Sequence, residues 1–126
     1  MMTDPITTRT ATISLRADGI VRTVVKAPNG RESLADAQAN IAAVQTLSPE
    51  KRRPMLVDMR AVDGIEREVR AYYSSVEVST ARALLVESPV GRVIANFFIS
   101  LSKPRVPTQL FTSEAEAIAW LKGFME

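Results

Sequence analysis

Apolar and polar residues alternate twice near the start of the chain, and this pattern predicts two neighbouring strands. The first alternation covers 11–16, and the second covers 20–26 after the dipeptide Asp18-Gly19. An alternation of period two places every second side chain on one face of a sheet. Glycine also tolerates the positive φ that a tight hairpin turn needs. We therefore expect the chain to open with an antiparallel hairpin.

Apolar residues recur at helical spacing in four later segments. Three of these segments follow a serine suited to cap a helix, namely Ser33, Ser88 and Ser113. Ser33 and Ser113 each have an acidic residue three positions on, which predicts capping boxes, and Pro89 fits the first turn of a helix. The four expected helices cover about 34–48, 65–76, 89–101 and 114–124.

Short apolar runs between these helices predict three further strands. The run 54–58 is apolar until Asp58, which is typical of a strand covered on both faces, so we place it at the centre of the sheet. A second run covers 80–87. The run 108–111 follows two prolines and is placed at an edge, because proline cannot donate to a strand ladder.

The expected order of elements is therefore β-β-α-β-α-β-α-β-α. Strands that alternate with helices argue for an α/β fold, in which the sheet is mostly parallel after the antiparallel N-terminal hairpin. A length of 126 residues suits one domain. We predict a single α/β domain over 10–126, preceded by a short N-terminal tail over 1–9.

Composition limits the chemistry. The chain is 46% hydrophobic and 24% charged, as in ordinary globular proteins, and its net charge of +2 gives no reason to expect a nucleic-acid partner. It contains neither histidine nor cysteine, which supply the usual zinc ligands, thiolate nucleophiles and proton-transfer groups. We predict a protein that is not an enzyme and needs no metal or cofactor. The start lacks a secretion-signal pattern and no apolar run is long enough to span a membrane, so a cytoplasmic location is expected.

The order of elements, the segment PMLVDMRAVDGI at 54–65 and the closing segment PTQLFTSEAEAIAWL at 107–121 resemble the STAS domains. This is the fold of the SpoIIAA-like bacterial anti-sigma-factor antagonists, and the resemblance extends to uncharacterised bacterial STAS/SEC14-like proteins. It covers Thr10 to Phe124. The resemblance implies a SpoIIAA-like fold and a regulatory module that binds other proteins.

Antagonists of that family carry a phosphorylatable serine in an Asp-Ser-Ser/Thr-Gly motif, at the start of the helix after the central strand. The resemblance places that motif on Glu66, Arg67, Glu68 and Val69, so the acceptor serine is absent here. A phosphate would add about two negative charges at such a site. We therefore predict that serine/threonine phosphorylation does not switch this protein.

Two carboxylates, Asp58 and Glu87, stand at the ends of predicted parallel strands. If those strands are neighbours, both carboxylates lie at the edge where open α/β sheets bind their ligands. A paired-carboxylate or Mg²⁺ site is one interpretation. The favoured alternative is that both groups accept backbone hydrogen bonds in the loops.

The same edge carries the starts of several helices, whose free N–H groups and dipoles favour anions. Arg67 and Arg70, three positions apart, either face this crevice or pair with nearby glutamates in solvent. Arg60 follows the central strand, and Ser88 and Arg92 lie in the first turns of the third predicted helix. We predict that an anionic ligand or partner binds among these residues: Arg60, Arg67, Arg70, Ser88 and Arg92.

The third predicted helix is apolar on nearly all sides, with Phe98 and Ile99 beside its inward stripe. Deep burial and a contact surface explain this pattern equally well. The second explanation predicts a homodimer through Phe98 and Ile99. Three functions follow in order of preference: a protein-interaction or regulatory module, a carrier or sensor of a small apolar or anionic ligand, and a carboxylate-dependent enzyme.

Overall fold

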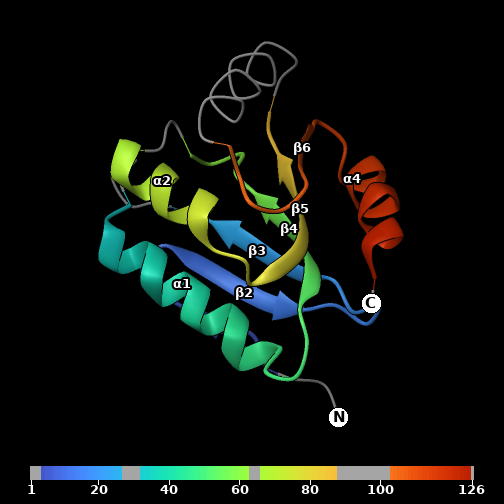
Figure 1. Cartoon of the computed structure of the whole chain (residues 1–126), viewed down its shortest axis with the longest axis horizontal. Coiled ribbons are helices and arrows are strands. Elements are labelled where there is room, and N and C mark those ends of the chain that lie inside the picture. The colour runs from blue at the N-terminus through green and yellow to red at the C-terminus, as the bar shows by residue number, and fades with distance from the viewer. Residues whose placement is uncertain (1–3, 27–31, 63–65, 88–102, 126) are drawn as a thin grey trace.

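The computed structural model describes residues 4–26, 32–62, 66–87 and 103–125. These residues form a mixed six-stranded sheet in which every strand pairs with the next strand in the chain (Figure 1). The first three strands are antiparallel, and the last three continue the sheet parallel to the third. The strands are β1 (Ile6–Thr7), β2 (Ala11–Leu15), β3 (Val21–Val25), β4 (Arg53–Asp58), β5 (Ser79–Leu85) and β6 (Thr108–Phe111).

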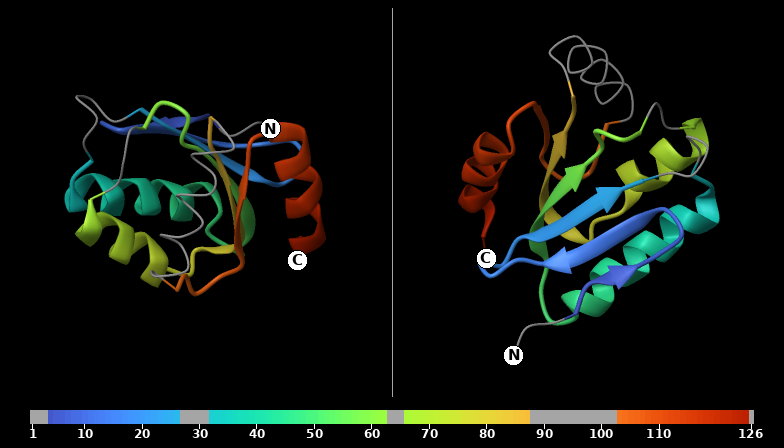
Figure 2. Two further views of the ribbon diagram at one scale, coloured as in Figure 1. Left: turned by 90° about the horizontal axis from the view of Figure 1, so that it is seen from above. Right: turned by 180° about the vertical axis from the view of Figure 1, so that it is seen from behind.

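Helices cover both faces of this sheet. One face is covered by α1 (Leu34–Leu47) and α2 (Arg67–Ser75), and the other by α4 (Glu114–Leu121), as Figure 2 shows. A short 3₁₀ turn, η2 (Lys122–Phe124), continues α4. In the described part of the chain, no helix has both the length and the apolar character needed to cross a membrane.

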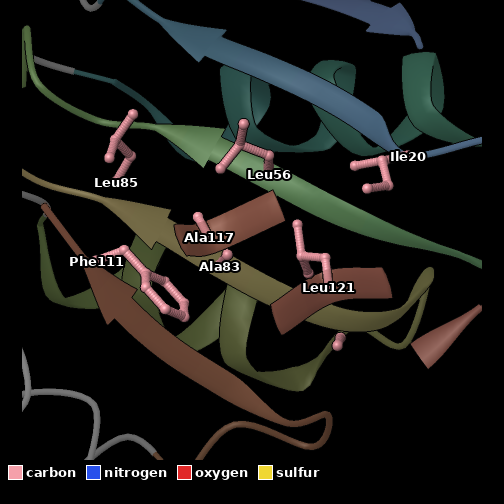
Figure 3. Packing of buried hydrophobic residues seen from close by; sticks show 8 residues of the cluster. Ile20, Leu56, Ala83, Leu85, Phe111, Ala117 and Leu121 are labelled. Carbon is pink, nitrogen blue, oxygen red and sulfur yellow. The ribbon is translucent and has the colours of Figure 1, made fainter. Parts of the chain in front are cut away.

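Buried hydrophobic residues in the described part of the chain form two clusters, one on each face of the sheet. Met55 of β4 packs in the cluster beneath α1, while the next residue, Leu56, packs in the cluster beneath α4. Figure 3 shows this second cluster, where Leu85 and Phe111 lie near Ala117 of α4. A strand that buries both faces explains the continuous apolar run at 54–58.

The structure confirms the α/β fold class. Gly19 has φ +88° in the turn between β2 and β3, as the predicted hairpin requires. The strand β4 lies between β3 and β5 inside the sheet, and β6 lies at its edge, as predicted. Residues 6–7, which the prediction left in an N-terminal tail, form β1 and pair with β2.

The helix caps follow the prediction in part. Ser33 and Asp36 form the full capping box of α1. Ser113 caps α4 by accepting a hydrogen bond from the backbone N–H of Glu116. The reciprocal bond of a capping box, from the backbone N–H of Ser113 to the side chain of Glu116, is not formed between these two described residues. The third predicted helix lies outside the described residues, and so do the predictions that rest on it.

Candidate functional site

A cleft with a volume of about 710 Å³ lies between α2 and the segment 103–105. We call it the basic cleft, because the lining residues that the structure describes include four arginine or lysine side chains and no carboxylate. Its walls come from parts of the chain that are far apart in the sequence. The lining residues are Arg67, Arg70, Ala71, Ser74, Ser75, Lys103 and Arg105.

One wall of the basic cleft is a single face of α2. Residues spaced by three and four positions lie on the same side of a helix, which brings Arg67, Arg70 and Ser74 into one row. Val69 lies outside this row and is the buried residue of α2. The sequence therefore places the cations on the solvent side of a helix whose apolar contact faces the sheet.

The other wall is held close to α2 by the backbone. The N–H of Arg105 donates to the carbonyl of Ser74 at 3.1 Å, which joins the segment to the last turn of α2. Two residues further on, the carbonyl of Pro107 accepts from the N–H of Arg82 in β5 at 2.8 Å. Pro104, directly before the first anchor, fixes its own φ. The second wall is therefore a stiff segment rather than a free loop.

Lys103, the first residue of the segment 103–105, has an unusual backbone conformation. Its φ of +49° lies in the left-handed region, where residues other than glycine and asparagine are uncommon. Such conformations persist when the surrounding structure holds them in place, and they concentrate at binding sites. A residue with a strained backbone, Lys103, therefore lines the basic cleft.

The cations of the basic cleft give it a positive potential. Arg67, Lys103 and Arg105 are exposed, and none of the three takes part in the ion pairs formed within the described ranges. Like charges gathered on facing walls raise the local concentration of anions. Chemically, the arrangement suits carboxylate or phosphoryl groups.

A buried arginine anchors the end of α2 next to the basic cleft. The side chain of Arg82 donates to the carbonyls of Tyr73 and Val76, and the residue is only 6% exposed. These carbonyls lie at the negative end of the helix dipole, where a cation is favourable. Burial lowers the pKa of the Arg82 guanidinium to about 10, so it remains charged at neutral pH.

A second polar contact joins α2 to the region of α1. The phenol of Tyr73 donates to Glu32 Oε1 at 2.6 Å, and Asn40 Nδ2 donates to Glu32 Oε2 at 3.1 Å. Burial, together with the bond to Glu32, raises the pKa of Tyr73, because both disfavour the phenolate. The helix that carries Arg67 and Arg70 is therefore fixed at its C-terminal half by polar side chains.

Asp58 lies elsewhere, on the α4 side of the sheet, and its carboxylate is engaged. It accepts from the backbone N–H of Arg60 at 3.1 Å and from the Arg60 guanidinium at 3.0 and 2.8 Å. Arg22 lies 3.6 Å away and also bonds Glu114 of α4 at 2.9 Å. The guanidinium of Arg60 is the main reason why the pKa of Asp58 lies below its ordinary value. This geometry favours the structural interpretation of Asp58.

Glu87 follows β5, the neighbour of β4, and it is exposed. Its charge acts on Arg60, so both predicted carboxylates lie near the same guanidinium. Among the residues that the structure describes, no group of three or more acidic side chains could hold a metal ion. The Mg²⁺ interpretation gains no support from the geometry of Asp58.

The structure brings together only some of the residues predicted to bind an anion. Arg67 and Arg70 line the basic cleft, whereas Arg60 bonds Asp58 and is not part of that lining. A ligand-binding role for Arg60 stays a prediction. Four other predicted residues lie outside the described ranges, so the anion site and the self-association surface assigned to them also stay predictions: Ser88, Arg92, Phe98 and Ile99.

Sequence reasoning missed Lys103 and Arg105. The available signal was the segment Lys103-Pro104-Arg105, in which a proline separates two cations. That signal is weak, because it does not show which helix the segment will approach.

One family model matches residues 13–125, that of a domain of unknown function, DUF7793. No curated protein matches the chain. Among solved structures, a protein of unknown function from Arthrobacter sp. FB24 is 37% identical, with 92% of this chain and 95% of that chain covered and a TM-score of 0.36. An uncharacterized DUF3478-family protein with a SpoIIAA-like fold from Shewanella loihica PV-4 is 12% identical, with 96% and 99% covered and a TM-score of 0.62.

The solved structures and the family model give different information about this chain: the first shows its fold, and the second shows its family. The similarity to the Shewanella loihica protein confirms the predicted SpoIIAA-like fold, but at 12% identity it shows the fold alone. The resemblance to STAS domains is thus confirmed for the fold, while the family model that matches the chain is that of DUF7793.

Proposed function

The chain belongs to the DUF7793 family of domains of unknown function, and we propose that it is a non-catalytic module that binds an anionic partner in the basic cleft. One observation carries the proposal. Cations from α2 and from the segment 103–105 converge on one cleft of about 710 Å³, and its described lining residues include no acidic side chain. Gathering like charges is unfavourable unless an anion offsets their repulsion.

Two features support binding rather than catalysis. The sequence lacks histidine and cysteine, and the carboxylate of Asp58 is occupied by Arg60. The basic cleft offers guanidinium, ammonium and hydroxyl groups, which hold anions well but do not accept protons at neutral pH. A regulatory role through a bound partner fits these groups better than a chemical step.

The described surface gives less support to a carrier of apolar molecules. Among the described residues, Met125 is the large hydrophobic residue that is exposed, at 39%. An apolar ligand requires a concave, mostly apolar site. The lining of the basic cleft is polar and charged, so an anionic ligand is the better match.

The proposal is tested with inorganic tripolyphosphate as a simple polyanion, titrated by calorimetry at low ionic strength. The parent should bind it, and the double variant Arg67→Gln/Arg105→Gln should bind about tenfold more weakly, because each exposed charge pair changes an affinity by a few-fold. Added salt should weaken binding by screening the charges.

A matched control removes the same charge elsewhere. Lys51 and Lys122 are exposed cations outside the basic cleft, so Lys51→Gln/Lys122→Gln lowers the net charge equally. This control should bind tripolyphosphate as tightly as the parent does. In both proteins, NMR should show that binding shifts the backbone amide resonances of α2, Lys103 and Arg105. Equal binding by the parent and the Arg67/Arg105 variant would refute the proposed function.

A further inference from the structure

The described lining of the basic cleft comes from two segments of the chain, α2 and 103–105. Arg67, Arg70 and Ser74 follow one face of α2, and Lys103 and Arg105 lie on the opposite wall. At 1.5 Å per helical residue, the row from Arg67 to Ser74 extends for about 10 Å. An extended peptide covers the same length with about three residues, at roughly 3.3 Å each.

From this geometry, and resting on the proposed function, we infer that the anionic partner is an acidic segment of another protein, bound in an extended conformation. Carboxylates on successive residues of such a segment point to opposite sides. One set would meet the guanidinium groups of α2, and the other would meet Lys103 and Arg105. The two rows of cations match this alternation.

The lining argues against a compact metabolite. Binding sites for small molecules are lined mainly by apolar and aromatic side chains that match the shape of the ligand. In the basic cleft, Ala71 is the single apolar residue among the lining residues described. A polar, charged cleft recognises charge along a chain better than the outline of a small molecule, and a lone phosphate would fill little of 710 Å³.

The lining also argues against nucleic acid. Single strands are held by aromatic side chains on which bases stack, in addition to cations. Tyr72 and Tyr73 are not part of the lining, and the phenol of Tyr73 bonds Glu32. The net charge of +2 also gives no extended field for a phosphate backbone.

The basic cleft is organised before the partner arrives. The bond from Arg105 N–H to Ser74, the ring of Pro104 and the contacts of Arg82 with α2 fix both walls. A rigid cleft pays little conformational entropy on binding, so most of that cost falls on the flexible partner. Disordered acidic segments bind in this way, with modest affinity.

The experiment compares probes on one protein by fluorescence anisotropy at low ionic strength. The probes are a short peptide of consecutive glutamates, the same peptide with glutamine in place of glutamate, a single-stranded oligonucleotide and tripolyphosphate. The parent and the Lys51→Gln/Lys122→Gln control should bind the acidic peptide more tightly than the other probes. Arg67→Gln/Arg105→Gln should weaken peptide binding about tenfold, by a few-fold for each charge.

Lys103→Gln, on the opposite wall, is an independent variant in case the double variant fails to fold, and it should weaken peptide binding by a few-fold. Circular dichroism checks the fold of each variant. If tripolyphosphate binds in the basic cleft and the acidic peptide does not, the peptide inference is wrong and the proposed function stands. Tighter binding of the oligonucleotide also overturns the inference. If no anionic probe binds, the inference and the proposed function both fail.

Discussion

The left-handed backbone of Lys103 leads to a prediction about stability. At φ +49° a Cβ atom approaches the following carbonyl oxygen, which costs about 1–2 kcal/mol. Glycine avoids this cost, but its greater freedom in the unfolded chain offsets about 0.5–1 kcal/mol. Lys103→Gly should therefore be more stable than Lys103→Ala by about 0.5–1 kcal/mol, the reverse of their order in an ordinary helix.

Comparing these two variants isolates the backbone. Both remove the same ammonium group from the basic cleft, and both retain Pro104, so changes in charge repulsion and in the proline contact cancel. Urea unfolding measures the free-energy difference, and for a chain of this size thermal unfolding should show a difference of about 2–5 °C.

Binding provides a second readout for the same pair. Both variants should bind tripolyphosphate a few-fold more weakly than the parent, since each lacks one exposed charge. The two variants should therefore differ in their free energy of unfolding but not in their affinity for tripolyphosphate. If Lys103→Ala proves as stable as Lys103→Gly, the strain assigned to Lys103 is absent and the reasoning is wrong.

Two further predictions concern the polar contacts. Asp58→Asn should lower the free energy of unfolding by about 2 kcal/mol at neutral pH, because charged hydrogen bonds to the Arg60 guanidinium are lost. The pKa of Asp58 in the folded protein lies below the ordinary 3.8. The Asp58 carboxylate therefore stabilises the fold above pH 3.8, and this contribution is lost as the pH falls through the folded pKa. A difference in unfolding free energy between parent and variant that stays constant in acid would contradict this. Tyr73→Phe should cost about 1 kcal/mol by leaving Glu32 without its phenol donor, and hydrogen exchange should speed up at α2 amides; unchanged exchange there would show that this contact does not hold the helix.

Much of the fold followed from local patterns. The sequence predicts the hairpin because Gly19 meets a conformational need that few other residues meet, and it predicts the central position of β4 from the continuous apolar run at 54–58. In the structure Met55 and Leu56 of that run face opposite sides of the sheet. The strand β1 was missed, since Ile6–Thr7 is too short to show a periodic pattern. Its pairing with the predicted strand β2 became visible only in the folded chain.

The polar contacts were harder to predict. In α1 the sequence pattern predicted an apolar face, yet Asp36 and Asn40 are buried on the inner side of that helix. They are tolerated there because Asn40 bonds Thr10 and Glu32, and Asp36 completes the cap of α1. A single sequence shows polar residues but does not show which partners will satisfy them.

The amino-acid sequence by itself determined the order of the described strands and helices after β1, the absence of histidine and cysteine, and the position of Arg67 and Arg70 on one helix face. All three depend on composition or on spacings of a few residues. The basic cleft depended on tertiary structure, because Lys103 and Arg105 reach α2 only after β5 and β6 pair side by side. Tertiary structure also decided which charges are engaged, placing Arg60 on Asp58 and leaving Arg67 to line the basic cleft. Electrostatic interactions depend on distance in space, and distances between remote segments are set by the packing of the whole sheet.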